Sequence, residues 1–182
     1  AYFTNGVPAR VDQNVAGLTL GGLYVSGADT LFTNSTVTLN NNGNPALVTV
    51  EGNAVTATVA LTLSPAAGTA ISKAGTGTLR LEKYLTVPSG LTVENGLLDL
   101  RFKDNSDGLN VGSGTITVGN GAVLRCGGNN QINNYAVLDI QAGGTVDQAN
   151  KTDNIGALTG SGVLTNHSST IQFWLNGATR LF

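Results

Sequence analysis

The feature that most constrains this chain is a glycine turn that recurs along the sequence and is followed each time by a short apolar strand. Aligning these turns places Gly96, Gly114, Gly121, Gly144 and Gly162 at equivalent positions. The long intervals, such as that from Gly96 to Gly114, match one coil of a β-solenoid, and the short one, from Gly114 to Gly121, matches two strands within a coil. The aligned segments are "TVPSGLTV" at 86, "TVENGLLDL" at 92, "NVGSGTITV" at 110, "TVGNGAVL" at 117, "IQAGGTVD" at 140 and "LTGSGVLT" at 158.

Between the turns the chain alternates apolar and polar residues, and no helical periodicity competes with this pattern. The stretch "NAVTATVALTLS", residues 53–64, predicts a strand with one buried face. With 25 glycines among 182 residues, the composition suits many short strands and many tight turns. The residues of this stretch expected on its buried face are Val55, Ala57, Val59, Leu61 and Leu63.

Together these patterns predict an all-β chain that forms a right-handed parallel β-helix of about seven to nine short coils. A β-sandwich or jelly roll is the alternative, although so many glycines would weaken a flat sheet. Residues 1–182 read as a single β-solenoid domain, and "TIQFWLNGATRLF" ends within a strand pattern, as a fragment of a longer protein would. Residues 39–46 and 101–110 are expected to form loops that protrude from corners.

The charge pattern argues against several classes of partner. The net charge is −2 and no basic stripe is present, so a nucleic-acid partner is not expected. A single cysteine, Cys126, excludes an internal disulfide, and we expect it to be buried and inert. No apolar run approaches the roughly 20 residues that a membrane span needs. We expect no cofactor, no metal and no catalytic residue.

One stretch, "SKAGTGTLRLEKYLTVPSGLTVENGLLDLR" at residues 72–101, resembles the autotransporter-associated β-strand repeat. The segment "EKYLTV" departs from the family, which usually has an Asn-Thr-Tyr-x-Gly bridge there. The resemblance implies a parallel β-helix in the passenger of a large protein secreted to the bacterial cell surface, with no common catalytic residues. The positions that fit are Lys73, Gly75, Gly77, Thr78, Leu79 and Leu81 in the first half, and Thr92, Val93, Gly96, Leu98 and Leu100 in the second.

A structural and surface-display module is therefore the first functional interpretation, with neighbouring coils of the parent protein as its partners. Its exposed end strands would otherwise favour end-to-end self-association. The second interpretation is an adhesin that binds glycan or host matrix through loops. Its candidate residues are Asp104 and Asp107 in the loop 103–110, and Asn129, Asn130 and Tyr135 in the Asn-rich segment 127–135.

The third interpretation is a polysaccharide-degrading enzyme. Asp99, Arg101 and Lys103 alternate along one strand and so share a face, and Arg80 and Glu82 on a neighbouring coil could pair with them. A solvated outer face explains the same residues without chemistry. "KAGTGT" is no phosphate loop, because its lysine precedes the glycines and a strand follows. The segment "DNSDG", residues 104–108, lacks the spacing of an EF-hand calcium site and is interpreted as an Asx turn. His167 is the only histidine in the sequence and has no evident catalytic or metal-binding partner.

Overall fold

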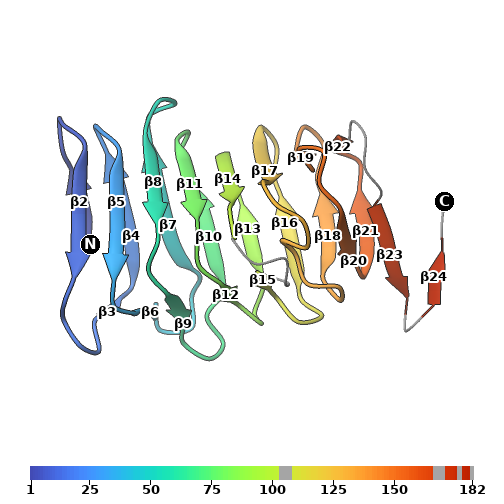
Figure 1. Ribbon diagram of the computed structural model, residues 1–182, viewed down its shortest axis with the longest axis horizontal. Coiled ribbons are helices and arrows are strands. Elements are labelled where there is room, and N and C mark those ends of the chain that lie inside the picture. The colour runs from blue at the N-terminus through green and yellow to red at the C-terminus, as the bar shows by residue number, and fades with distance from the viewer. Residues whose placement is uncertain (103–107, 166–170, 176–177, 181–182) are drawn as a thin grey trace.

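Short strands and glycine corners build a three-sided parallel β-solenoid of about seven turns, which confirms the predicted fold class. The computed structural model describes residues 1–102, 108–165, 171–175 and 178–180. Figure 1 shows the strands stacked side by side along the long axis, from the N-terminal end to the C-terminal end. All regular elements in the described part of the chain are strands.

Two sides of the solenoid are continuous eight-stranded sheets, and the third side is divided into separate short sheets. The first sheet contains β1 (Tyr2–Thr4), β4 (Gly22–Ser26), β7 (Ala46–Glu51), β10 (Ile71–Ala74), β13 (Leu91–Val93), β16 (Thr115–Val118), β18 (Val137–Ile140) and β21 (Ala157–Gly160). The second sheet contains β2 (Ala9–Gln13), β5 (Thr30–Asn34), β8 (Thr56–Val59), β11 (Thr78–Leu81), β14 (Gly96–Leu100), β17 (Ala122–Cys126), β19 (Thr145–Asp147) and β22 (Val163–Thr165). The third side contains β3 (Thr19–Leu20), β6 (Val37–Leu39) and β9 (Leu63–Pro65), then β12 (Leu85–Thr86) and β15 (Leu109–Asn110), then β20 (Asp153–Ile155), β23 (Ile171–Leu175) and β24 (Ala178–Arg180).

Parallel pairing from turn to turn sets the register and stacks like residues on like. On the first sheet Ile71 pairs with Leu91, Leu91 with Ile116, and Ile116 with Leu138. The turn from Ile71 to Leu91 is therefore shorter than the turn from Leu91 to Ile116. The third side and its corners absorb the difference, so the two long sheets keep their ladders intact.

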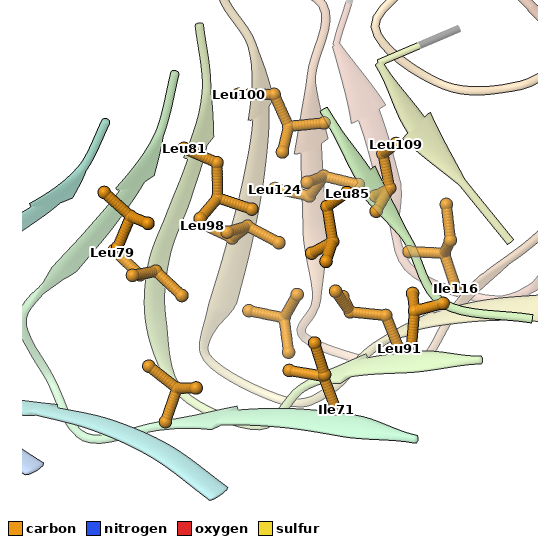
Figure 2. Close-up of a cluster of buried hydrophobic side chains, with 14 of the residues drawn as sticks. Ile71, Leu79, Leu81, Leu85, Leu91, Leu98, Leu100, Leu109, Ile116 and Leu124 are labelled. Carbon is orange, nitrogen blue, oxygen red and sulfur yellow. The ribbon is translucent and has the colours of Figure 1, made fainter. Parts of the chain in front are cut away.

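The core is a column of apolar side chains that all three sides contribute. Figure 2 shows leucines and isoleucines from the three sides pointing toward one another in the middle of the molecule. Leu98, Leu100, Leu109, Ile116 and Leu124 are fully buried. Each buried side chain of this size contributes about 1.5–3 kcal/mol by leaving water, so the column is the main source of stability.

Glycine is required where a corner stacks tightly on the turn before it. Gly96 has φ 67°, and a β-carbon placed on it would lie 2.5 Å from the Gly75 carbonyl oxygen. Gly96, Gly121, Gly144 and Gly162 all lie at the corner between the first and second sheets, as their alignment implies. Gly114 does not, because it lies at the corner where the third side leads into β16. The residue spacing alone could not separate the two kinds of corner.

Residues 53–64 bury the face that their alternation predicts, although they do not form one strand. Their five alternate apolar residues are all buried, and Val59 ends β8 while Leu63 begins β9. The chain bends from the second sheet to the third side between them, without a glycine. The expected loop at 101–110 is also partly regular, since Leu109 and Asn110 form β15. Residues 39–46 form a tight turn closed by a bridge between Asn41 and Asn44.

The two ends of the solenoid differ. At the C-terminal end β23 pairs in parallel with β20, and β24 then pairs antiparallel with β23 (Figure 1). At the N-terminal end β1, β2 and β3 pair only with the turn that follows them. Within the described residues, β1, β2 and β3 are therefore the first strands of their sheets.

Candidate functional site

The predicted loop residues that the structure describes lie on the third side. The Asn129 side-chain oxygen accepts a hydrogen bond from the Thr152 amide at 3.0 Å, and the Asn130 amide donates to the Thr152 carbonyl at 2.9 Å. Tyr135 lies further along the same segment, before β18, with 61% of its surface exposed. Asn129 and Asn130 thus both contact Thr152 on the next turn. Tyr135 lies apart from them as an exposed ring. Asp104 and Asp107 lie outside the described residues, as do Lys103 and His167.

The outer face of the second sheet carries a row of charges of alternating sign. Arg80, Asp99, Arg125 and Asp147 occupy paired positions on successive turns. Arg80 Nε lies 3.0 Å from Asp99 Oδ2, and Arg125 Nε lies 2.9 Å from Asp147 Oδ2. The prediction that Arg80 pairs with Asp99 from a neighbouring coil is confirmed. Each of these two ion pairs joins one turn to the next, and Asp99 and Arg125 lie at paired positions between them.

Asp99 is held more tightly than an outer-face residue usually is. Arg101 Nε donates to Asp99 Oδ1 at 2.9 Å from the same strand, so two arginines bind one carboxylate. Only 1% of the Asp99 side chain is exposed, against 39% for Arg80 and 43% for Arg101. The expectation of a solvated face therefore holds for the arginines and fails for the carboxylate. A carboxylate covered in this way is poorly placed to contact a substrate.

Lys73, the first residue of the family-like pattern, lies in β10 and is buried inside the solenoid, with its ammonium group at the corner that follows the strand. Its ammonium donates to the carbonyls of Ala74, Gly75, Gly77 and Asn95, at 3.0, 2.6, 2.8 and 2.8 Å. Burial lowers the pKa of Lys73 to about 8, and the charge of Glu51 opposes that change. Because Asn95 belongs to the next turn, Lys73 binds two consecutive corners together.

A thiol and a carboxyl group meet in the core near the C-terminal end. Cys126 at the end of β17 and Asp153 at the start of β20 are both fully buried, and the thiol hydrogen-bonds to the carboxyl group. Two backbone amides donate to Asp153, from Gln131 at 3.0 Å and from Ile132 at 3.2 Å. Burial raises the pKa of Asp153 to about 7, against the effect of these amides. Burial and the nearby carboxylates also raise the pKa of Cys126, which confirms a buried thiol with little thiolate character.

Side-chain amides complete the third side where its strands are interrupted. Gln131 Oε1 accepts from the Phe102 amide at 2.9 Å, and Gln131 Nε2 donates to the Phe102 carbonyl at 3.3 Å. Asn133 Oδ1 accepts from the Val111 amide at 3.0 Å, and Asn133 Nδ2 donates to the Gly112 carbonyl at 2.7 Å. Each amide satisfies one donor and one acceptor of the preceding turn, as a neighbouring strand would. Gln131, Asn133 and Asp153 therefore act as structural substitutes for backbone pairing.

Sequence reasoning did not identify Lys73, Gln131, Asn133 or Asp153 as buried polar residues. A signal was present for Lys73, because it shares the strand face of Ile71, two residues earlier, and that face points inward. No comparable signal exists for Asp153, whose contacts lie a full turn away in the sequence.

The described residues contain no group of three or more His, Cys, Asp or Glu side chains able to hold a metal ion. None of them forms a helix long and apolar enough to cross a membrane. Comparisons with protein-family models, with curated proteins and with solved structures found no match to this chain. The functional argument therefore rests on the geometry of the chain itself.

Proposed function

We propose that this chain is a non-catalytic structural module, a β-helix that acts as a stalk or scaffold in an autotransporter-like protein displayed on a bacterial cell surface. The observation that carries the proposal is the use made of the buried charged groups. Lys73, Asp99 and Asp153 each join one turn of the solenoid to another. Buried charged groups whose hydrogen bonds join one turn to another are not available to react with a substrate.

The geometry also suits a mechanical role. The backbone hydrogen bonds of both long sheets join turn to turn, so they lie along the axis of the rod. Pulling on the two ends loads many such bonds in each turn at once, with the ion-pair row of the second sheet beside them. A rod built in this way resists stretching and denies proteases the local unfolding that they need.

The experiment compares protease resistance with ligand binding on the same preparation. A stalk should resist trypsin and subtilisin until it unfolds globally, and it should bind nothing on a glycan array or a panel of host-matrix proteins. Labelling of intact cells that carry the parent protein with a membrane-impermeant amine reagent tests the location separately, because a protease-resistant stalk would withstand a protease even at the cell surface. Rapid cleavage of the native chain would contradict the mechanical role, and protection from labelling would contradict display.

An adhesin is the second candidate, and the exposed ring of Tyr135 favours it. An aromatic face in water is a platform on which the apolar face of a sugar ring can stack. Under this alternative the wild-type chain binds at least one glycan on the array, and Tyr135→Ala abolishes that binding without changing the melting temperature. Tyr84→Ala, at a second exposed tyrosine, is the matched control.

A further inference from the structure

Asparagine is followed by glycine at four places in the described part of the chain, which are Asn5, Asn42, Asn95 and Asn120. In such a pair the glycine nitrogen can attack the asparagine Cγ, because glycine has no β-carbon to hinder the approach. The reaction requires an accessible side-chain amide, a glycine N–H that is not held in a hydrogen bond, and a backbone that can rotate until the two atoms meet. The four pairs differ in these requirements, so the fold decides which of them can react.

Asn42 and Gly43 are the two central residues of the turn that joins β6 to β7, and both are exposed. Their φ angles are 53° and 84°, which matches the type I′ turn that an Asn-Gly pair favours. The Asn42 side-chain amide and the Gly43 N–H have no hydrogen-bond partner in the part of the chain that the structure describes. A β-carbon placed on Gly43 would have no atom within 4 Å beyond its chain neighbours, so the turn has room to rearrange.

The contacts that close this turn are local. The Asn44 amide donates to the Asn41 carbonyl at 3.0 Å, and the Asn41 side-chain amide donates to the Pro45 carbonyl at 2.9 Å. Neither contact belongs to the ladder of a sheet, so rotating the peptide between the two central residues leaves the stacked turns in place. Leu39 and Ala46, at the two ends of the segment, are buried and anchor the strands on either side.

Asn95 lies at a corner that the turn before it holds in place. Its carbonyl accepts a hydrogen bond from the Lys73 ammonium at 2.8 Å. Gly96 is packed so closely that a β-carbon on it would lie 2.5 Å from the Gly75 carbonyl oxygen. Rotating the peptide between Asn95 and Gly96 would break the contact with Lys73 and open the corner. This pair is therefore protected, although Asn95 itself is exposed.

The other two pairs are also held by neighbouring turns. The Gly121 amide donates to the Gly143 carbonyl at 3.0 Å, so the nitrogen that follows Asn120 is engaged. Asn5 is half-buried, and its carbonyl oxygen packs so tightly against Gly27 that a β-carbon there would collide with it. Asn42 is therefore the member of the set that combines an exposed side-chain amide with an unengaged glycine nitrogen.

We propose that Asn42 is a site of spontaneous deamidation, at which the chain acquires an aspartate or an isoaspartate without the help of an enzyme. The Gly43 nitrogen bonds to Cγ of Asn42, and its proton leaves with the side-chain NH2 group as ammonia. Water then opens the resulting succinimide. Breaking the bond from nitrogen to Cγ gives aspartate, and breaking the bond from nitrogen to the backbone carbonyl carbon gives isoaspartate, whose main chain runs through Cβ and Cγ.

Either product changes the corner between the third side and the first sheet. It adds one negative charge to a chain whose net charge is −2, and isoaspartate also lengthens the backbone of the turn. Because Asn42 lies outside the ladders, we expect the product to keep the fold and to accumulate as the molecule ages. The inference goes beyond the stalk role and does not depend on the location of the protein.

Peptide mapping of the full chain tests the proposal, because trypsin places each Asn-Gly pair in a different peptide, namely residues 1–10, 11–73, 84–101 and 104–125. The folded chain is incubated in mildly alkaline buffer, then denatured, digested and analysed by mass spectrometry, with fragmentation to locate the converted residue. Asn42 should convert at least about tenfold faster than the asparagines of the last two peptides, since their conversion requires stacked turns to open. An isoaspartate methyltransferase with a labelled methyl donor measures the isoaspartate share.

Two comparisons separate the effect of the fold from that of the sequence. In concentrated urea the four pairs should convert at rates within about threefold of one another, because unfolding removes the contacts that protect three of them. Asn42→Gln should abolish conversion at this turn, since the longer glutamine side chain cyclises far more slowly, and Asn120→Gln should leave the Asn42 rate unchanged. Conversion of Asn95 or Asn120 as fast as Asn42 in the folded chain would overturn the proposal, and so would an Asn42 that stays intact there.

Discussion

The two long sheets and the third side satisfy their backbone hydrogen-bond donors and acceptors in different ways. Every strand of the long sheets finds its hydrogen-bond partners in the turns before and after it, and its inward residues are almost all apolar. The third side is broken between β9 and β12 and again between β15 and β20, and at the second break Gln131, Asn133 and Asp153 supply hydrogen-bond partners from inside the molecule. A broken ladder is thus tolerated if buried side chains take over its donors and acceptors.

This difference explains how the solenoid accommodates turns of different length. The ladders of the long sheets stay in register from β4 to β21, although the turn that begins at Leu91 is longer than the turn that begins at Ile71. Additional residues enter at the third side, where pairing is already discontinuous. The long sheets therefore maintain the rod, and the third side is where the sequence can vary.

The largest expected effect comes from emptying the column that the long sheets share. Leu124 is fully buried in β17, so Leu124→Ala leaves a cavity that neighbouring turns cannot fill. We expect the free energy of unfolding to fall by about 4 kcal/mol in chemical denaturation followed by circular dichroism. Val123→Ala, at the preceding residue and on the outer face, should cost less than about 1 kcal/mol. Similar losses for the two variants would contradict an inward–outward division of the strand.

Asp153 should make the stability of the third side depend on pH between about 4 and 7. The folded-state pKa is raised from 3.8 to about 7, so the folded chain holds a proton that the unfolded chain has lost. The contribution of Asp153 to stability is full below about pH 4 and is lost as the pH rises to 7, by about 3 kcal/mol. Asp153→Asn carries no titrating group there, and its unfolding free energy should not show this fall.

The measurement is the difference between wild type and Asp153→Asn across this pH range. Lys73 does not interfere, because its lowered pKa of about 8 makes stability rise only as the pH increases from about 8 toward 10.5. The buried Cys126 thiol, with its raised pKa, stays protonated over the range. A constant difference between the two proteins from pH 4 to 7.5 would show that Asp153 is ionised in the folded chain.

The same contrast shows how much of the fold the sequence could predict. The long sheets follow from local rules, since alternation sets the buried face of Val55, Ala57 and Val59 and glycine marks the corners. The third side does not follow from such rules, because Gln131 and Asp153 are polar residues whose burial depends on the turn stacked against them. Asp99 is similar, since arginines on two strands cover it. The local sequence pattern predicts the strands and corners. Contacts between residues a full turn apart can be predicted only once the register of the stacked turns is known.

The candidate site was less predictable still. Asn129 is a predicted ligand-binding residue, and the structure pairs its side-chain oxygen with the Thr152 amide. An asparagine in a turn is equally suited to either role, because its amide satisfies backbone groups as readily as those of a sugar. Among the candidates that the structure describes, Tyr135 keeps the exposed ring that the sequence assigned to it.

A smaller effect should come from removing one substitute partner on the third side. Gln131→Ala leaves the buried amide and carbonyl of Phe102 without their side-chain partner. We expect a loss of about 2 kcal/mol in unfolding free energy, within the range for an unsatisfied buried group. Asn129→Ala is the matched control, because its exposed partner, the Thr152 amide, can turn to water. If the two variants lose the same amount, Gln131 does not replace a strand.

The smallest effect belongs to the outer charge row of the second sheet. In Asp99→Asn the arginines lose a charged partner, but Arg80 and Arg101 are about two-fifths exposed and can be solvated by water. We therefore expect a loss of only about 1 kcal/mol, less than for Gln131→Ala, whose backbone partners cannot reach water. Raising the salt concentration from about 0.1 to 1 M should shrink the loss, because salt screens exposed charges. Asp139→Asn, at a more exposed hydrogen bond on the first sheet, should have almost no effect at either salt concentration. A loss of about 3 kcal/mol or more for Asp99→Asn that salt does not change would place Asp99 with the buried groups of the third side.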